Sequence, residues 1–322
     1  MQNPRYVDVN GIKTRYFEEG QGEPLVLIHG GNFGNEDNID LTDNWDLNWP
    51  WFVKWFHVYA LDKLGQGFTD LPQSDADYTM GAIVEHAYGF IRELGLEKVH
   101  LVGHSRGAYV VTRLTLEHPD LVRTLVIVDS NTIAPGENPS NAQERSKMRR
   151  GRLMADAPKP LLSRESLKWV SEAFSYSGGG VTDKWLDIRH EVASRPQTLQ
   201  AIEKMSELFS TTFLPHLAGQ KEESHQWVQA GKLKTPTLLI WGYNDPSAIV
   251  EDGVELFRMI APHVPRAQMH IFNQAGHYSY REHPEDFARV VADFILAGGS
   301  SDRSTGPLQR HSGWASSKRV VE

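Results

Sequence analysis

The chain has 322 residues, of which 40% are hydrophobic and 23% are charged, a composition typical of a soluble globular protein. Its formal net charge is −8 and no long basic run appears within the predicted fold, so nucleic acid is not expected as a partner. No apolar stretch approaches the length of a membrane span, and the N-terminus lacks an apolar signal segment, so neither a membrane partner nor a secretory leader is predicted. The absence of cysteine excludes disulfides, thiol catalysis and thiolate metal sites, and it favours a cytoplasmic location.

The first predicted element is a β-hairpin. Two strand-like runs flank Asn10 and Gly11, and an Asn-Gly pair between two strands is a strong hairpin signal. Beyond the hairpin, short and fully apolar runs alternate with amphipathic helices, which predicts a mostly parallel, doubly wound α/β sheet. After the hairpin strands at 6–9 and 12–17, the predicted strands span 24–28, 56–61, 99–102, 125–128, 237–241 and 268–272, and the predicted helices span 79–94, 108–117, about 250–260 and about 284–296.

The alternation of strands and helices stops near Pro135 and resumes at residue 237. In the intervening segment the chain is charged, rich in Trp, Met and Phe, and helical in pattern, with no predicted strand. The predicted fold is therefore one α/β domain with a helical cap inserted between strands 6 and 7. The core comprises residues 1–133 and 231–297, the cap comprises residues 134–230, and the polar segment 298–322 is predicted to be a disordered tail.

The most informative motif is Gly103-His104-Ser105-Arg106-Gly107, which has the form G-x-S-x-G. It follows an apolar strand and precedes a helical pattern, and the sequence of strand, sharp turn and helix is the context of a nucleophile elbow. Glycines on both sides leave space for the strained turn, so the Ser105 hydroxyl projects at the N-terminal end of the helix. We therefore predict that Ser105 is a catalytic nucleophile.

A serine nucleophile needs a base and an orienting acid. Asp245 follows the seventh predicted strand and His277 follows the eighth. Both loops leave the carboxyl ends of parallel strands, which is the edge where Ser105 lies, so the sequence predicts a triad of Ser105, His277 and Asp245. Asp129, which follows the sixth strand, is an alternative acid, whereas Asp62 is interpreted as a hydrogen-bonding loop residue.

Acyl-type chemistry also needs donors for an oxyanion. One predicted donor is the backbone N–H of Arg106, which follows the nucleophile, and the other is the N–H of Gly31 or Asn32 in the His-Gly-Gly-Asn loop. The histidines show no HExxH or comparable spacing, so no metal site is predicted, and no cofactor is expected. The predicted partner is a small-molecule substrate, and a homo-oligomer is compatible with the sequence.

These motifs resemble the α/β-hydrolase superfamily over residues 5–297. Within it the chain looks most like the meta-cleavage-product hydrolases, which break a C–C bond in ring-fission products of aromatic compounds. The resemblance implies an α/β-hydrolase fold and hydrolysis of a 2-hydroxy-6-oxo-dienoate. The segments that carry it are HGGN at 29–32, DKLGQG at 62–67, GHSRG at 103–107, WGYND at 241–245 and AGH at 275–277.

The resemblance also implies substrate-binding residues. The cap segment RHEVASRP is similar to one in that family, in which an arginine at the position of Arg189 binds the substrate carboxylate. The alternative for Arg189 is a solvated charge on a helix face. Tyr278 matches the family's aromatic residue after the catalytic histidine, and His104 replaces the family's usual asparagine before the nucleophile. Asn48 or Asn44 would supply the family's active-site asparagine.

Three functional classes remain open from the sequence. The first is a C–C hydrolase acting on a carboxylated ring-fission product. The second is a carboxylesterase, lactonase or amidase that uses the same triad on a small apolar substrate. The third is a non-catalytic binding protein of the same fold, which the complete triad in the sequence disfavours. The Trp-rich segment at 45–55 and the cap predict a largely apolar pocket, with packing of the tryptophans in the core as the alternative.

Overall fold

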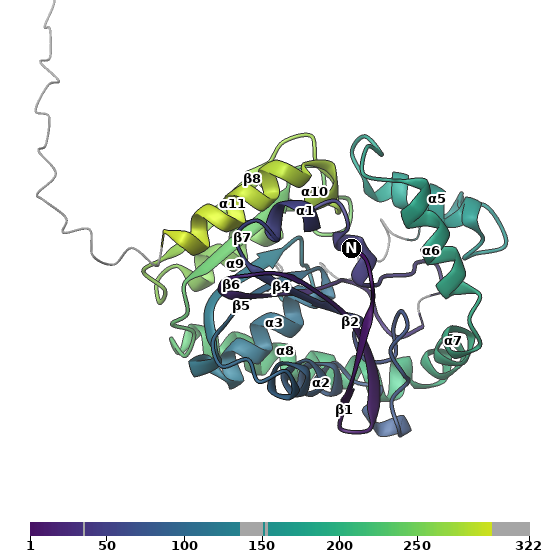
Figure 1. Cartoon of the computed structure of the whole chain (residues 1–322), viewed down its shortest axis with the longest axis horizontal. Helices are drawn as coiled ribbons and strands as arrows, with labels where there is room; N and C mark the ends of the chain where they lie inside the picture. Colours follow the sequence, from purple (N-terminus) through teal and green to yellow (C-terminus); the bar gives the residue numbers. More distant parts are fainter. Residues whose placement is uncertain (35, 136–150, 152–153, 298–322) are drawn as a thin grey trace, which may run out of the picture.

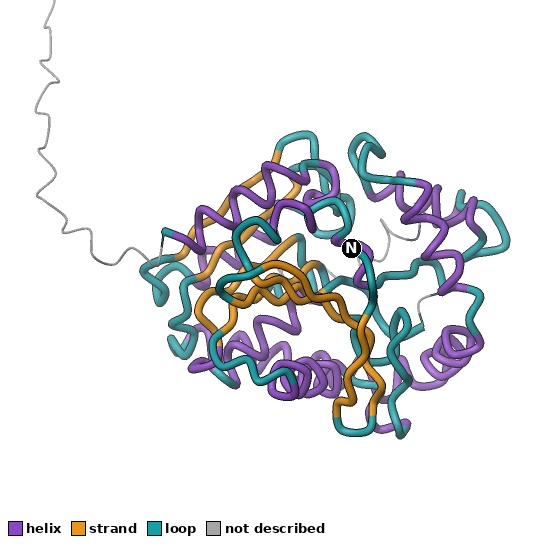
Figure 2. The backbone as a smooth tube through the Cα atoms, in the orientation of Figure 1, coloured by secondary structure: helices purple, strands orange, loops and turns teal. Residues whose placement is uncertain are grey.

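The computed structural model describes residues 1–34, 36–135, 151 and 154–297. Eight strands form one sheet in the order β1-β2-β4-β3-β5-β6-β7-β8, and Figure 2 shows this twisted layer with helices on both sides. Along β4-β3-β5-β6-β7-β8 the neighbouring strands are parallel, whereas the pairs β1–β2 and β2–β4 are antiparallel. The strands are β1 (Arg5–Val9), β2 (Ile12–Gly20), β3 (Pro24–Ile28), β4 (His57–Leu61), β5 (Val99–His104), β6 (Val122–Val128), β7 (Thr237–Gly242) and β8 (Ala267–Phe272).

The predicted hairpin is present. Val9 pairs with Ile12 across a two-residue turn, and Asn10 and Gly11 have φ values of 53° and 85°. A turn with positive φ at both central positions matches the right-handed twist of the two strands, which is why Asn-Gly is favoured there. The predicted parallel sheet is also present, because its strands are apolar on both faces and each face is covered by helices.

Alternate residues of the central strands pack into two separate cores. In β3, Val26 and Ile28 face the core under α2, α3 and α9, whereas Leu25 and Leu27 face the core under α1 and α11. Figure 1 shows α2 and α3 below the sheet and α11 above it. The helices of these two layers are α1 (Trp49–Phe52), α2 (Met80–Glu93), α3 (Arg106–Glu117), α9 (Val250–Ile260), α10 (Ser279–Glu282) and α11 (Pro284–Leu296), with short turns η2 (Asp75–Asp77) and η3 (Pro119–Leu121).

Further helices lie between β6 and β7, where the sequence predicts a cap. Helices α5, α6 and α7 stand beside the sheet in Figure 1, and α8 returns beneath the domain to pack on α2 and α3. A third apolar cluster joins α5 and α6 to the loop at Ile39 and Leu41. Residues 136–150 and 152–153 of the predicted cap, and the predicted tail 298–322, lie outside the described residues. The cap elements are α5 (Arg164–Phe174), α6 (Asp183–Ala193), α7 (Pro196–Leu208), the π-helix η4 (Phe209–Phe213) and α8 (Leu214–Gln229).

The Trp-rich segment differs from the pocket that the sequence predicts. It forms the short helices η1 (Thr42–Trp45) and α1, and both Trp45 and Trp49 are fully buried. Trp45 packs on Tyr280 with ring centroids 4.5 Å apart, and Trp49 packs on Phe17. The core-packing alternative is therefore correct for these two tryptophans, because they belong to the apolar cluster that packs α11 on the sheet, where the Trp45 ring also lies 6.3 Å from the Phe287 ring. No helix among the described residues is long and apolar enough to cross a membrane.

Candidate active site

Ser105 occupies a strained turn between β5 and α3. Its φ of 53° and ψ of −121° form a conformation that side-chain-bearing residues rarely adopt. A Cβ on Gly103 would lie 2.3 Å from the Gly107 carbonyl oxygen, and one on Gly107 would lie 2.3 Å from the Ile28 oxygen. The Ser105 N–H donates to the Val128 carbonyl of β6 at 2.8 Å, which fixes the turn at the sheet edge. This is the backbone geometry of a nucleophile elbow, and both glycines are required by close approach.

His277 and Asp245 form a buried pair after β8 and β7. The distance from His277 Nδ1 to Asp245 Oδ2 is 2.7 Å. The second carboxylate oxygen of Asp245 accepts the backbone N–H groups of Ser247 and Ala248 at 2.7 and 2.9 Å. The His277 N–H donates to the Phe174 carbonyl of α5 at 2.8 Å. Asp245 therefore directs the imidazole so that Nε2, the nitrogen a general base would use, lies away from the carboxylate.

The pKa of His277 reflects opposing effects. Burial disfavours the charged imidazolium and lowers the pKa, whereas Asp245 raises it through charge and hydrogen bonding, and Asp129 and Asp40 raise it further. The balance leaves the pKa above its usual value of 6.5. A raised pKa makes His277 a stronger base and stabilises the imidazolium that forms when it takes a proton.

Asp129, the alternative acid, has other partners. One carboxylate oxygen accepts the backbone N–H of Gly242 at 2.7 Å, and the other accepts the Ser279 hydroxyl at 2.5 Å. Burial and the nearby Asp245 carboxylate raise its pKa well above the usual range. Asp129 therefore links β7 to α10, while Asp245 makes the hydrogen bond to His277.

His104, predicted to bind substrate, supports the loop that carries His277. Its Nε2 lies 2.8 Å from the His277 carbonyl oxygen, which can only accept, so Nε2 carries the proton. Burial, and then the neighbouring His277, lower the pKa of His104 well below 6.5, so the ring is neutral. Its Nδ1 is consequently a buried acceptor, and it has no hydrogen-bond partner among the described residues. A Cβ on Gly30 would lie 3.0 Å from this nitrogen.

The His-Gly-Gly-Asn loop passes directly over Ser105. A Cβ on Gly30 would lie 3.0 Å from the Ser105 Cβ, which is a tight contact, so a larger residue at this position would press on Ser105. The Gly30 carbonyl accepts from His29 Nδ1 at 2.8 Å, and the Gly31 carbonyl accepts from Lys63 Nζ at 2.9 Å. On the other side of Ser105, α3 begins at Arg106, and the first N–H groups of a helix have no carbonyl partner within that helix.

Arg189 is fully buried, so a solvated helix-face charge is excluded. Its Nε donates to the Ile39 carbonyl at 2.6 Å, its Nη1 donates to the Ser171 hydroxyl at 2.5 Å, and its Nη2 donates to the Asn38 side-chain oxygen. The guanidinium carbon lies 4.2 Å from the centroid of the Trp185 ring. Burial lowers the pKa of Arg189, yet a guanidinium retains its charge at any physiological pH.

Two further residues beside Arg189, Trp185 and Arg281, belong to no motif that marks them in the sequence. Trp185 also contacts the Arg281 guanidinium, whose carbon lies 4.0 Å from the ring centroid. Arg281 is buried and donates to the Asn44 carbonyl and to an Asp46 carboxylate oxygen, each at 2.6 Å. Trp185 lies on α6 and Arg281 lies on α10, and their contact is set by the tertiary fold rather than by a local pattern. A buried arginine four residues after His277 could have been noticed only from its position near the AGH motif.

Tyr278 and Asn48 have different surroundings. The Tyr278 ring lies 5.6 Å from the His277 ring and 5.5 Å from the Trp185 ring, which places it between the candidate base and the cap. The Asn48 amide nitrogen instead donates to the backbone oxygens of Tyr280 and Pro284 at 2.8 and 3.1 Å. Asn48 therefore holds the connection between α10 and α11. The sequence predicts Asn48 as a substrate-binding residue and does not indicate this contact.

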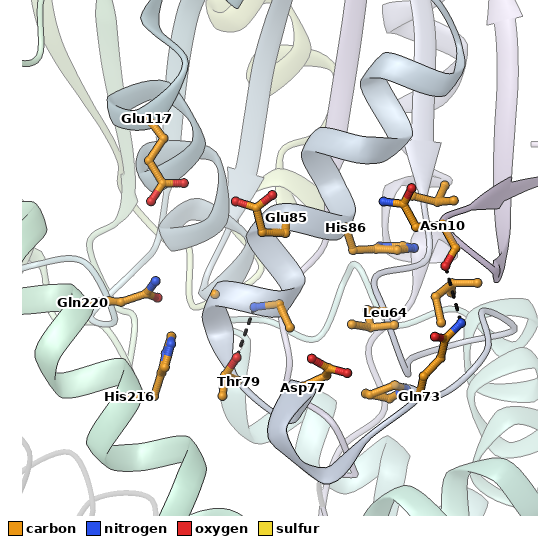
Figure 3. Close-up of a pocket in the computed structure, with 15 residues that line it drawn as sticks. Asn10, Leu64, Gln73, Asp77, Thr79, Glu85, His86, Glu117, His216 and Gln220 are labelled. Atoms are coloured by element: carbon orange, nitrogen blue, oxygen red, sulfur yellow. Dashed lines mark hydrogen bonds between the residues drawn. The ribbon is translucent and has the colours of Figure 1, made fainter.

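A cavity of about 480 Å³ lies away from these residues, between the β1–β2 hairpin, α2 and α8 (Figure 3). Its labelled walls include Asn10, His86 and Gln220, and no member of the predicted triad lines it. A second pocket, of about 20 Å³, lies beside the loop that passes over Ser105, between Asn32 of this loop and Val192 of α6. The loop, rather than the larger cavity, therefore marks the candidate site.

One group of described side chains could bring metal-ligand atoms together. Oxygen and nitrogen atoms of Glu85, Glu117 and His118 lie within 4.8 Å of one another. Glu117 also accepts a hydrogen bond from Arg113 Nε at 2.5 Å, so its carboxylate already has a cationic partner. The group shares no residue with the candidate active site.

Comparison with known proteins identifies the family. The model of the alpha/beta hydrolase fold family matches residues 23–284, and the chain belongs to this family. A 2-hydroxymuconate semialdehyde hydrolase from Pseudomonas sp. (strain CF600) is 30% identical over 90% of this chain and 93% of that protein. A 2-hydroxy-6-oxo-6-(2'-aminophenyl)hexa-2,4-dienoic acid hydrolase from Metapseudomonas resinovorans is 27% identical over 90% of each chain.

Within the family, the chain groups with the meta-cleavage-product hydrolases, as its motifs indicated. Among solved structures, a serine hydrolase involved in carbazole degradation superposes with a TM-score of 0.70 at 25% identity, covering 92% of this chain and 99% of that one. A meta-cleavage product hydrolase superposes with the same score at 24% identity, covering 91% of this chain and 98% of that one, which supports the fold. The chain is thus a hydrolase-family enzyme whose relatives act in the breakdown of aromatic compounds.

Proposed function

We propose that this enzyme hydrolyses a C–C bond in a 2-hydroxy-6-oxo-dienoate produced by aromatic ring fission. Ser105 is the nucleophile, His277 is the general acid and base, and Asp245 orients His277. The backbone N–H of Arg106 and an N–H of the loop at Gly31 and Asn32 bind the oxyanion. The hydrogen bond of 2.7 Å between His277 and Asp245 and the strained turn at Ser105 support these roles.

The observation that carries the choice of substrate is the buried Arg189. An arginine in a hydrolase cap would ordinarily be solvated, but this one is enclosed at the cap–core boundary beside Trp185, which contacts Tyr278. Burying a guanidinium away from water costs free energy unless a charged or hydrogen-bonding partner compensates for the lost hydration. One of its partners, the Asn38 side chain, is neutral and belongs to a loop, so a substrate carboxylate can replace it as a stronger, bidentate acceptor.

The reaction follows from this placement. His277 and Ser105 first move the proton of the 2-hydroxyl to C5, which converts the dienol to the 2-oxo form. Ser105 then attacks the C6 carbonyl, its proton passes to His277, and the C6 oxygen becomes the oxyanion. The C5–C6 bond breaks with its electron pair flowing through C3–C4 to the 2-oxygen, near the cationic Arg189, and His277 gives its proton to the departing dienolate. Water then hydrolyses the acyl-enzyme to release the carboxylic acid, so the net reaction adds one water across C5–C6.

A carboxylesterase or lactonase acting on a small apolar substrate is the second candidate. It is favoured by one observation: Arg189 already donates to Ile39, Ser171 and Asn38, so all three of its nitrogens have protein partners. A neutral ester would leave this arrangement undisturbed. His104 in place of the asparagine expected from the family resemblance is also compatible with ester hydrolysis.

The deciding experiment offers the purified enzyme three kinds of substrate. Yellow 2-hydroxy-6-oxo-dienoates with hydrogen, methyl and phenyl groups at C6 are followed by their loss of colour, and aryl esters and lactones are followed in parallel. We expect rapid bleaching of at least one dienoate, with a higher kcat/KM than for any ester. Fast ester or lactone hydrolysis without bleaching would overturn the C–C assignment and support the second candidate. The Ser105→Ala variant is the blank for each assay.

A further inference from the structure

Lys63 is a fully buried lysine immediately after β4 that the proposed reaction does not use. Its side-chain Nζ donates to the Gly31 carbonyl at 2.9 Å, and its backbone N–H donates to His29 Nε2 at 3.1 Å. His29 in turn donates through Nδ1 to the Gly30 carbonyl at 2.8 Å. A single residue therefore fixes both consecutive carbonyls of the loop over Ser105, one directly and one through His29.

We propose that Lys63 is a positioning residue for the oxyanion hole, which it assembles by holding the Gly31 carbonyl with a charged donor. The inference rests on the serine mechanism of the proposed function but not on its C–C substrate. An oxyanion forms at Ser105 whether the acyl group comes from a dienoate or from an ester, so the role of Lys63 can be tested with either.

The planarity of the peptide bond connects Lys63 to the hole. In a trans peptide the C=O and the following N–H point in opposite directions. Lys63 donates a hydrogen bond to the Gly31 carbonyl, so the N–H of Asn32 points away from Lys63. His29 donates a hydrogen bond to the Gly30 carbonyl, so the N–H of Gly31 points away from His29. These are the two N–H groups between which the sequence leaves the loop's oxyanion donor open, the other predicted donor being the N–H of Arg106. Both N–H groups of the loop are thereby oriented before substrate arrives, which is the requirement for electrostatic preorganisation.

The charge on Lys63 adds to this orientation. Hydrogen bonds that share a peptide group polarise one another, so a cation on the Gly31 carbonyl strengthens the Asn32 N–H as a donor. The ammonium sits in a dry environment, where an ionised donor makes a stronger hydrogen bond than a neutral one. Lys63 is therefore expected to stabilise the oxyanion through the peptide rather than by touching the substrate.

Asp40 completes the surroundings of Gly31. A Cβ on Gly31 would lie 2.6 Å from both Cβ and Oδ2 of Asp40, so this position, with φ of 75°, tolerates only glycine. The Asp40 carboxylate accepts from the amides of Asn38 and Asn44 at 2.6 and 2.7 Å. Gly31 is thus confined between an anion on one side and the Lys63 cation on its carbonyl.

The protonation of Lys63 is set by the groups around it. Burial lowers its pKa to about 7, with attraction from Asp40 opposing the shift and repulsion from Arg106 adding to it. The two other titratable neighbours, His29 and His104, are neutral because burial lowers the pKa of each. Lys63 therefore loses its charge as the pH rises through neutrality, and the oxyanion donors weaken in the same range.

The test compares three substitutions of Lys63 by steady-state kinetics. Lys63→Met removes both donor and charge, Lys63→Gln keeps a donor without charge, and Lys63→Arg keeps the charge. A p-nitrophenyl ester and a dienoate are assayed with each variant. We expect Lys63→Met to lower kcat by on the order of 10- to 100-fold with KM changed less than threefold, because the oxyanion exists only in the transition state. Lys63→Gln should be intermediate, and Lys63→Arg should recover most of the lost kcat.

The pH profile separates positioning from a merely structural role. Wild-type kcat should fall as the pH rises above about 7 with the charge on Lys63, whereas Lys63→Arg should keep its kcat to higher pH because guanidinium does not titrate there. The matched control is Lys221→Met. Lys221 is a partly buried lysine bound to a backbone carbonyl, that of Asn131 at 3.2 Å, but it lies outside the loop. This variant should keep wild-type kcat and its pH dependence.

The proposal is overturned if Lys63→Met keeps kcat within twofold of wild type, if its loss appears only in KM, or if Lys221→Met shows the same loss. Circular dichroism and thermal unfolding establish that each variant is folded; should Lys63→Met not fold, the comparison of Lys63→Gln with Lys63→Arg decides. Inactivity on every dienoate, with the expected ester results, overturns the C–C assignment alone. The rate of Ser105 phosphonylation by paraoxon gives a third readout, and it should fall in Lys63→Met and not in Lys221→Met.

Discussion

Trp185 and Arg189 lie one helical turn apart on α6 and hold the same core loop at two points. The Trp185 indole N–H donates to the Asn44 side-chain oxygen at 2.9 Å, and Arg189 donates to the Asn38 side-chain oxygen. Asn44 and Asn38 both donate to Asp40, which contacts the glycine loop over Ser105. Four hydrogen bonds and one turn of α6 therefore form a ring that joins this helix to Asp40, and Asp40 in turn lies against Gly31.

The first prediction concerns the nucleophile. Ser105→Ala should reduce kcat by on the order of a million-fold on dienoate and ester alike, because all steps after ketonisation need the serine oxygen. The fold should persist, since alanine can occupy the same turn and, within the part of the chain that the structure describes, no neighbouring element depends on a hydrogen bond from the Ser105 hydroxyl. Stopped-flow absorbance and thermal unfolding measure the two effects. A variant with more than one-hundredth of wild-type turnover would remove Ser105 from the mechanism.

The second prediction distinguishes the two buried aspartates. Asp245→Asn should lower kcat by on the order of ten-thousand-fold, because an amide that donates to Nδ1 holds His277 in the wrong tautomer. Asp129→Asn serves as the matched control, since Asp129 bonds to Gly242 and Ser279 and not to His277. Its principal effect should be on the melting temperature. If Asp129→Asn were the more damaging change for kcat, the acid would have to be reassigned.

Much of the fold could be predicted because its signals are local. Buried parallel strands are short apolar runs, and β3 has the residues 24–28 that the sequence indicates. Some strands are longer than the sequence predicts, because pairing with a neighbouring strand extends them. β5 continues through His104 and β6 begins at Val122, and the two strands pair along this length. The sequence left two interpretations of the Trp-rich segment open, because the burial of Trp45 and Trp49 depends on their tertiary packing, which no local pattern reveals.

The residues of the candidate site also differ in whether local sequence signals could predict them. Ser105, Asp245 and His277 each follow a recognisable parallel strand, so their location at the same edge of the sheet was predictable from topology. The network at Asp40 was not, because it joins a loop to a helix about 150 residues later, and its asparagines carry no motif. Lys63 lies inside a recognised motif, DKLGQG, but only its contact with Gly31 distinguishes it from a solvated loop lysine.

The third prediction concerns pH. His277 must be neutral to accept a proton, and its pKa is raised above 6.5 by Asp245 against the effect of burial. Activity should therefore be lost as the pH falls through a midpoint above 6.5, and be restored above it. The Lys63→Arg variant gives the cleanest acid limb, because it removes the alkaline limb expected from Lys63. Measured kcat/KM for an ester between pH 5 and 8, roughly the range in which histidine titrates, locates the midpoint. A midpoint clearly below 6.5 would contradict the assigned pair.

The fourth prediction tests the carboxylate site. Arg189→Gln should lower kcat/KM for a dienoate by about 2–3 kcal/mol, or roughly 30- to 150-fold, because the substrate carboxylate would be buried without a charged partner. The same variant should change kcat/KM for a neutral p-nitrophenyl ester by less than about threefold. Lys168→Gln, an exposed charge change on α5, is the control for altered net charge. Equal losses on both substrates would assign Arg189 a structural role.

The last prediction follows from the ring that joins α6 to the core loop. In the unliganded enzyme the Asn38 side chain occupies Arg189 Nη2, so a substrate carboxylate must displace it. Asn38→Ala removes this competitor and leaves a buried charge short of one acceptor. The free energy of unfolding of this variant should therefore be lower by about 1–3 kcal/mol, because that is the cost of an unsatisfied buried donor, and its melting temperature should fall accordingly. The carboxylate of a substrate would supply the missing acceptor, so KM for a dienoate should fall or stay constant in Asn38→Ala. In the Ser105→Ala background, added dienoate should raise the melting temperature more steeply when Asn38→Ala is also present than when it is absent. Neutral esters should show neither effect. A higher KM for the dienoate in Asn38→Ala would mean that Asn38 assists the carboxylate instead of standing in for it.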